Sequence, residues 1–264
     1  MSNRSKENKL KVFASDLDQT LIFSKRWIPN VEEELKCIER YGDGGRSYML
    51  EEAERLLLSI QDEFEFVPVT TRTREQYDRI AFEVEPQYAI CCNGGVVLID
   101  GEPDEKWDRA IAKKMEGVRS LSEVKKTVEN AVDEYDGIRI RTVEQLFLYV
   151  ILKDKKLAKQ VEICLAKVFS STKWSIYQHG SKVYVMPKFL TKASALSYLL
   201  EKLDAKKTVT SGDSRLDFGM REVSDWFITP GHVDFSGDYN CDGEGLESGL
   251  ETLTEAYRYL SRKN

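Results

Sequence analysis

The sequence predicts an α/β protein, a doubly wound parallel sheet that carries a smaller inserted α+β domain. Over most of the 264 residues, short apolar runs alternate with longer helical patterns. That alternation is typical of parallel strands joined by crossover helices. Between residues 105 and 186 the pattern changes to adjacent strand pairs. Hairpins of this kind do not belong in a doubly wound parallel sheet, so we expect them to form a separate domain.

The core is predicted from five strands and three amphipathic helices. The strands are expected at Leu10–Ser15, Phe66–Thr70, Tyr88–Cys92, Thr208–Ser211 and Trp226–Thr229. Apolar residues recur at helical spacing in Glu51–Glu63, Thr191–Leu203 and Leu246–Arg262. We expect these apolar stripes to pack into the core.

The inserted block contains a repeated αββ pattern. The expected helices are Ser122–Tyr135 and Lys155–Val168, and the expected strands are Gly137–Val143, Leu146–Leu152, Trp174–Gln178 and Lys182–Met186. Turn-rich segments flank the block near residues 101–104 and 187–190. We therefore expect a core formed by residues 1–104 and 187–264 and an inserted domain formed by residues 105–186.

Composition and charge restrict the possible functions. A net charge of −6 opposes a nucleic-acid partner, because phosphate backbones are bound mainly by a surplus of Lys and Arg. The polar start of the chain does not resemble a secretory signal, and we expect no membrane partner. The five cysteines show no CxxC spacing, which favours reduced thiols and a cytoplasmic location over disulfides or zinc.

The strongest local signal is the segment Ser15-Asp16-Leu17-Asp18-Gln19-Thr20, directly after the first strand. Ligand sites of open α/β sheets lie at the carboxyl ends of the strands, so Asp16 and Asp18 stand where chemistry is expected. Two carboxylates this close repel each other unless a cation lies between them. A helix cap or a turn is the structural alternative for this motif.

Two further strand ends and the start of one helix carry polar groups. Thr70 and Arg72 follow the second strand, where a hydroxyl can bind a phosphoryl oxygen, although Thr also caps helices. Asn93 and Gly94 follow the third strand and suit either close approach to a ligand or a plain hairpin turn. Lys192 opens a helix, an unfavourable place for a cation unless an anion is near, although a solvated Lys is the alternative.

The fourth strand ends in Gly212-Asp213-Ser214-Arg215-Leu216-Asp217, which supplies another pair of carboxylates. Mg²⁺ prefers oxygen ligands and usually takes one or two protein carboxylates. Asp16 and Asp213, on adjacent strands, meet that demand.

Taken together, these motifs resemble those of the haloacid dehalogenase superfamily of phosphatases. The Asp-x-Asp-x-Thr, the Thr, the Lys and the Gly-Asp-x-x-x-Asp occur in the family's order. The inserted αββαββ block looks like the type-2 cap of the Cof-like and sucrose-phosphatase-like branch, on a Rossmann-like core. The resemblance extends from about residue 10 onward. Cof-like members usually carry Asn where this chain has Leu216, which puts in doubt how Asp217 or the cap is held.

The resemblance implies roles for the residues of these motifs. Asp16 would be the nucleophile that forms an aspartyl-phosphate, and Asp18 the general acid–base. Thr70 and Lys192 would stabilise the charge of the transferring phosphoryl group. Arg72, Asn93 and Gly94 are candidates for substrate contact. Magnesium would be held by Asp16, the backbone carbonyl of Asp18, and Asp213, with Asp217 in support.

The expected function is that of a magnesium-dependent phosphatase acting on a small phosphorylated metabolite, with a sugar phosphate favoured by the resemblance. An inserted block of this size is expected to act as a lid that excludes bulky substrates. The alternative is a regulatory protein that binds phosphorylated ligands with little turnover. The sequence gives no prediction of the oligomeric state.

One further motif opens like a calcium-binding EF-hand loop, with Asp, Asn, Asp and Gly at positions 238, 240, 242 and 243. Gly249 stands where a bidentate Glu would be required. We therefore expect an exposed turn-rich loop rather than a calcium site.

Overall fold

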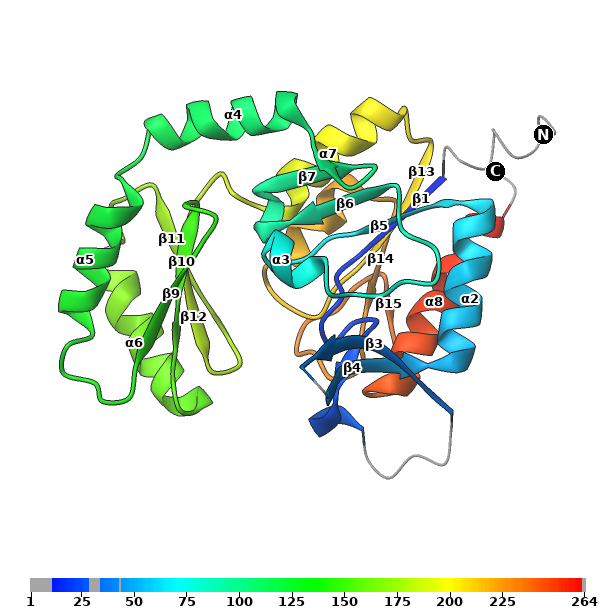
Figure 1. Cartoon of the computed structure of the whole chain (residues 1–264), viewed down its shortest axis with the longest axis horizontal. Coiled ribbons are helices and arrows are strands. Elements are labelled where there is room, and N and C mark those ends of the chain that lie inside the picture. The colour runs from blue at the N-terminus through cyan, green and yellow to red at the C-terminus, as the bar shows by residue number, and fades with distance from the viewer. Residues whose placement is uncertain (1–10, 29–33, 43, 263–264) are drawn as a thin grey trace. The chain divides into compact units, whose positions relative to one another are not determined.

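A computed structural model describes residues 11–28, 34–42 and 44–262 (Figure 1). The chain divides into two compact units, one formed by Met1–Asp104 and Lys192–Asn264 and the other by Glu105–Thr191. None of the helices in the described ranges is long and apolar enough to cross a membrane.

The larger unit is built on a five-stranded parallel sheet with the order β15-β14-β13-β1-β5. Its strands are β1 (Lys11–Ser15), β5 (Glu65–Pro68), β13 (Lys207–Ser211), β14 (Trp226–Thr229) and β15 (Tyr239–Asn240). The chain winds from β1 to β5 in one direction and through β13 to β15 in the other. The winding reverses between β1 and β13, the point at which open α/β sheets bind ligands. The predicted doubly wound parallel sheet is confirmed.

Two long helices cover this sheet. Helices α2 (Glu51–Glu63) and α8 (Leu246–Ser261) pack against each other and against strands of the sheet, as Figure 1 shows. Ala53, Leu57 and Ile60 form the buried stripe of α2 that the helical spacing predicted. Helix α7 (Lys192–Leu203) packs against β6 (Tyr88–Cys91), β7 (Val96–Ile99) and the 3₁₀ segment η3 (Phe218–Val223).

Strand β6 was expected to belong to the parallel sheet, but it does not pair with the strands of that sheet in the described residues. It pairs antiparallel with β7, and β7 pairs with β8 (Glu102–Pro103). A bridge between Val69 and Ile90 connects this small sheet to the end of β5. The cause is local, because the turn η2 (Cys92–Gly94) places Asn93 at φ 56° and folds the chain directly back on itself.

A β-hairpin that the sequence analysis did not predict precedes α2. It consists of β3 (Leu35–Tyr41) and β4 (Gly44–Leu50), with β2 (Phe23–Ser24) beside β4 and the 3₁₀ turn η1 (Lys25–Trp27) following β2. Charged residues interrupt the alternation of apolar and polar positions in both strands. Gly42 follows β3, and Gly44 and Gly45 begin β4; this group of glycines is the signal in the sequence that favours a hairpin.

The smaller unit has the predicted αββαββ order, preceded by an additional helix, α4 (Glu105–Glu116). Its four strands form an antiparallel sheet with the order β11-β12-β10-β9, and α5 and α6 pack against it. Val128, Val150, Val161 and Val185 lie in its core with no exposed surface. The bounds are α5 (Leu121–Ala131), β9 (Arg139–Val143), β10 (Phe147–Ile151), α6 (Lys155–Val168), β11 (Trp174–His179) and β12 (Lys182–Pro187).

Candidate active site at the carboxyl edge of the parallel sheet

Asp16 lies directly after β1, where the winding of the sheet reverses. Its backbone N–H donates to the carbonyl of Ser211 at the end of β13, at 3.0 Å. The side chain is buried, with Oδ1 accepting from Lys192 Nζ at 2.5 Å and Oδ2 accepting from Thr20 Oγ1 at 3.3 Å. The sheet thus fixes the backbone, and two donors fix the carboxylate.

Lys192 is the first residue of α7 and is only 1% exposed. Its Nζ donates to the carboxylates of both Asp16 and Asp217. Burial lowers the pKa of Lys192, but the ion pairs and hydrogen bonds with the two carboxylates outweigh burial and raise it above its ordinary value. A cation at a helix N-terminus is thereby stabilised by local anions rather than by solvent.

Asp16, Asp213 and Asp217 form an acidic cluster in which one carboxylate oxygen from each residue lies within 4.8 Å of the others. The side chains of Asp213 and Asp217 are 5% and 0% exposed. Burial, followed by the charges of Asp217 and Asp213, raises the pKa of Asp16 well above its usual value, although Lys192 works against the shift. The cluster therefore carries more negative charge than Lys192 balances.

Local geometry explains how Asp217 is held despite Leu216. Ser214 donates to Asp217 Oδ2 from its backbone N–H at 2.9 Å and from its hydroxyl at 2.6 Å. A Cβ at Gly212 would lie 2.2 Å from the Cβ of Asp217, so this approach requires glycine. Ser214 of this loop thus holds one oxygen of Asp217, and Lys192 of α7 holds the other.

The donor set of this cluster fits a magnesium ion. Three carboxylate oxygens gathered within a few ångströms are hard ligands of the kind that Mg²⁺ prefers. Among the described residues, no other group of three or more metal-ligating side chains is close enough to share an ion. The side chain of Asp18 is not a member of it.

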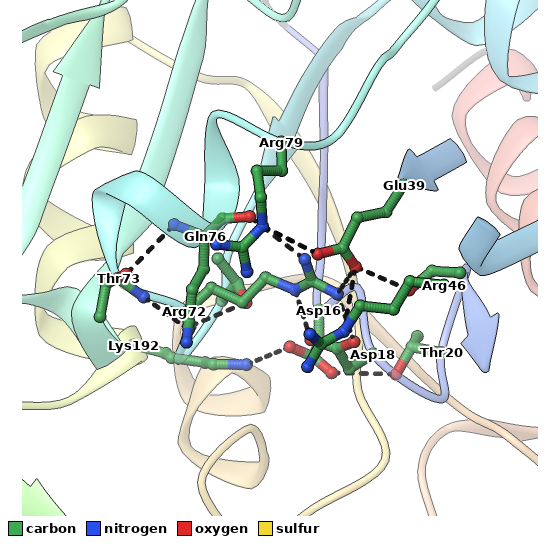
Figure 2. Close-up of polar contacts among 12 residues, drawn as sticks. Asp16, Asp18, Thr20, Glu39, Arg46, Arg72, Thr73, Gln76, Arg79 and Lys192 are labelled. Carbon is green, nitrogen blue, oxygen red and sulfur yellow. Dashed lines mark hydrogen bonds and ion pairs between the residues drawn. The ribbon is translucent and has the colours of Figure 1, made fainter. Parts of the chain in front are cut away.

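Asp18 instead pairs with Arg72, as Figure 2 shows. Arg72 Nε donates to Asp18 Oδ2 at 2.7 Å, and Nη2 donates to Oδ1 at 2.8 Å. The same Nη2 also donates to Oε2 of Glu39 at 2.9 Å. Burial lowers the pKa of Arg72, but its two carboxylate partners raise it further, so the guanidinium stays charged. In this structure, the residue expected to contact substrate pairs with two carboxylates of the chain.

Thr70, Asn93 and Gly94 are buried together where β5 and β6 end. Thr70 Oγ1 accepts from the backbone N–H of Arg72 at 3.1 Å, and the backbone N–H of Asn93 donates to the carbonyl of Thr70 at 3.0 Å. These bonds join the loop after β6 to the loop after β5. The turn thus orders the strand end that carries Arg72.

Glu39 was not predicted from the sequence, because a lone Glu in a charged strand gives no signal. Its side chain has no exposed surface, and it accepts from Arg72, Ser47 and Arg79. Burial raises the pKa of Glu39, but Arg72 and the other donors lower it more, so the net shift is downward. Had the hairpin been predicted, Glu39 would have stood out as a charged residue at an inward-facing position.

The loop that opens like an EF-hand is held by bonds within the chain. Glu251 of α8 accepts from the backbone N–H groups of Asp242 and Gly243 and from the hydroxyl of Tyr239. Asp238 accepts from Arg221 and from the backbone of Phe227. Both carboxylate oxygens of Asp238, the first residue of the motif, are thus engaged within the chain. The expected exposed turn-rich loop is corrected in part, because Tyr239–Asn240 form strand β15 beside β14 and Cys241 is buried.

Comparisons with known proteins show the family to which this chain is similar. A family model described as sucrose-6F-phosphate phosphohydrolase matches residues 9–226. The sucrose-phosphatase of Synechocystis, solved in complex with sucrose and phosphate, is 17% identical with a TM-score of 0.63, and the match covers 94% of this chain and 98% of that chain.

Two further solved structures share the fold. A trehalose-6-phosphate phosphatase related protein is 17% identical with a TM-score of 0.57, covering 96% of this chain and 100% of that chain. The C-terminal domain of the C. albicans trehalose-6-phosphate phosphatase is 14% identical with a TM-score of 0.62, covering 96% and 94%. A comparison with curated proteins finds no match. The family match over most of its length shows that the chain is a phosphatase of the haloacid dehalogenase superfamily and belongs to the sucrose-6F-phosphate phosphohydrolase family.

Proposed function

We propose that this phosphatase uses Mg²⁺ to hydrolyse the phosphomonoester of a small sugar through an aspartyl-phosphate on Asp16. The observation that carries the proposal is the buried Asp16 carboxylate, paired with Lys192 at 2.5 Å and clustered with Asp213 and Asp217. Buried carboxylates that cluster with a cation in this way are typical of functional sites.

The chemistry divides into two transfers. In the first, an oxygen of Asp16 forms a bond to phosphorus while the bond to the sugar oxygen breaks, and Asp18 donates a proton to that oxygen. In the second, water attacks the aspartyl-phosphate, Asp18 takes a proton from the water, and inorganic phosphate leaves with Asp16 regenerated. Thr70 and Lys192 stabilise the negative charge on the phosphoryl oxygens during both transfers.

Asp16, Asp213 and Asp217, together with the backbone carbonyl of Asp18, would hold the magnesium ion. When bound, the ion supplies positive charge that offsets the negative charge of the phosphoryl group. The fit is supported by the excess of carboxylates over cations in the cluster, because Lys192 balances only one of the three.

The sugar-phosphate substrate is supported by the names of the matching family and of similar solved structures. The matching family model is named for a sucrose phosphate, and two of the similar structures are named for trehalose-6-phosphate phosphatases or their relatives. The net charge of −6 gives polynucleotides little attraction.

The test is a panel of phosphomonoesters assayed for phosphate release with Mg²⁺. The panel compares sucrose 6F-phosphate, trehalose 6-phosphate and hexose phosphates with a nucleotide and a phosphoserine peptide, and the Asp16→Asn variant serves as the control. We expect the highest kcat/KM on a sugar phosphate. A peptide cleaved as well as the best sugar would refute the substrate class. Sugar phosphates bound without turnover would instead support a phosphometabolite-binding regulatory protein.

A further inference from the structure

We propose that Glu39 and Arg72 are positioning residues that orient the Asp18 carboxyl group for proton transfer. This inference rests on the proposed function, in which Asp18 is the acid–base. It assigns a role in catalysis to the β3–β4 hairpin, which contributes Glu39 but no residue of the acidic cluster.

The contact between Arg72 and Asp18 is bidentate. Two different nitrogens of the guanidinium donate to the two oxygens of the carboxylate, at 2.7 Å and 2.8 Å. Such a fork fixes both the position and the plane of the carboxylate, which a Lys ammonium cannot do. The side chain of Asp18 is 49% exposed, and the fork restricts its rotation.

Arg72 is in turn held by Glu39. The side chain of Arg72 is 9% exposed and that of Glu39 is 0% exposed, and Arg72 Nη2 bridges from Asp18 Oδ1 to Glu39 Oε2. Arg72 Nη1 also donates to the carbonyl of Gln76, at 3.2 Å. With partners on three sides, the guanidinium has little freedom to rotate away from Asp18.

Glu39 is itself fixed by donors around its carboxylate. Ser47, on the neighbouring strand β4, donates to Oε2 at 2.8 Å, and Arg79 Nε donates to Oε1 at 3.2 Å. Arg46 lies near the same carboxylate, at 3.8 Å. A buried carboxylate with this many partners is an anchor, because removing it would leave Arg72 and Arg79 without their shared anion (Figure 2).

This arrangement makes a chemical prediction that a structural role would not. A sugar alkoxide is a poor leaving group and needs a proton, whereas 4-nitrophenolate is a good leaving group and needs none. The ratio kcat/KM covers the steps through the departure of the leaving group. A variant that misplaces Asp18 should therefore lose more kcat/KM on the best sugar phosphate than on 4-nitrophenyl phosphate.

The experiment measures kcat/KM on the sugar phosphate and on 4-nitrophenyl phosphate, with Mg²⁺. It compares the wild type with Arg72→Gln, Glu39→Gln and the double variant. We expect each single variant to lose at least about tenfold more on the sugar phosphate than on the aryl phosphate, a fraction of what a general acid contributes. The double variant should be no worse than Arg72→Gln alone, because both residues act through one carboxylate. Arg72→Lys, which keeps the charge but lacks the fork, carries the test if Arg72→Gln does not fold.

The matched control is Arg74→Gln, the same change two residues further on. Arg74 is 37% exposed and pairs with Asp78 and Glu102 rather than with Asp18. For this variant, kcat/KM on the sugar phosphate divided by kcat/KM on 4-nitrophenyl phosphate should stay at the wild-type value. Equal losses on both substrates, or additive losses in the double variant, would overturn the inference while leaving the proposed function intact. A wild type that hydrolyses neither phosphate would overturn the proposed function itself, and this inference with it.

Discussion

Replacing Asp16 with Asn should abolish phosphatase activity without weakening the fold. The activity should fall by at least about a hundredfold, because an amide cannot serve as the nucleophile. The stability of the metal-free protein should be unchanged or slightly higher. This second expectation is unusual for a buried residue, and it follows from the charges around Asp16.

The charges can be compared on one scale. At an effective dielectric constant of about 20, two like charges 4.8 Å apart repel by about 3–4 kcal/mol, and Asp16 faces both Asp213 and Asp217 within that distance. Its attraction to Lys192 at 2.5 Å is worth about 6–7 kcal/mol on the same scale. These contributions nearly cancel. The cost of burying the Asp16 charge then decides the sign, in agreement with its raised pKa.

The assay is thermal unfolding in excess chelator at pH 7, alongside phosphate release with Mg²⁺. We expect Asp16→Asn to unfold at the wild-type temperature or a few degrees above it, at roughly 2–4 °C for each kcal/mol. Any advantage should disappear as the pH falls toward 3.8, the ordinary pKa of an Asp, because protonated Asp16 has no charge to bury. Unfolding several degrees below the wild type at pH 7, or near wild-type activity, would refute this reasoning.

Three further predictions concern the metal, the anchor and the loop. Millimolar Mg²⁺ should raise the melting temperature of the wild type but have little effect on Asp213→Asn, and equal shifts in a thermal scan would contradict the magnesium site. Glu39→Gln should be less stable than the wild type at pH 7 by about 3–5 kcal/mol in urea unfolding. Because the pKa of Glu39 is lowered from 4.5, that gap should close only as the pH falls through its folded-state pKa, and a gap that persists at lower pH would count against the ion-pair network. Glu251→Gln should lower the melting temperature because it weakens the bonds to the 238–244 loop, and full recovery with Ca²⁺ would show that the loop binds calcium after all.

The sequence was informative where local motifs and sheet topology act together. Asp16, Thr70 and Asp213 each stand at the end of a strand, and the carboxyl ends of parallel strands meet at one edge whatever the details of packing. The helix opened by Lys192 has a clear apolar periodicity, so its first turn could also be placed. Topology then brought these residues to one edge of the sheet without any need to know side-chain positions.

Side-chain partners across the chain could not be predicted in this way. Arg72 has a long side chain with many rotamers, and its direction is set by Asp18 and by Glu39, 33 residues away in the sequence. Glu39 lies in a hairpin whose charged strands hide the alternating pattern. The place of β6 in the parallel sheet was wrong for a different reason, since a tight turn at Asn93 diverts the next segment into a hairpin. A plain hairpin turn at Asn93 and Gly94 was the alternative that the sequence left open.

The two carboxylates of the first motif stand two residues apart in opposite charge environments. Asp16 belongs to a cluster of three carboxylates in which Lys192 pairs with Asp16 and Asp217, and Asp213 lies 3.5 Å from His232 Nε2. Asp18 belongs to a network in which two carboxylates share Arg72, and Glu39 has Arg79 as well. Only the first environment has an unbalanced negative charge that a divalent cation would offset. This asymmetry supports the proposed division of work, with metal and phosphorus chemistry at Asp16 and proton transfer at the half-exposed Asp18.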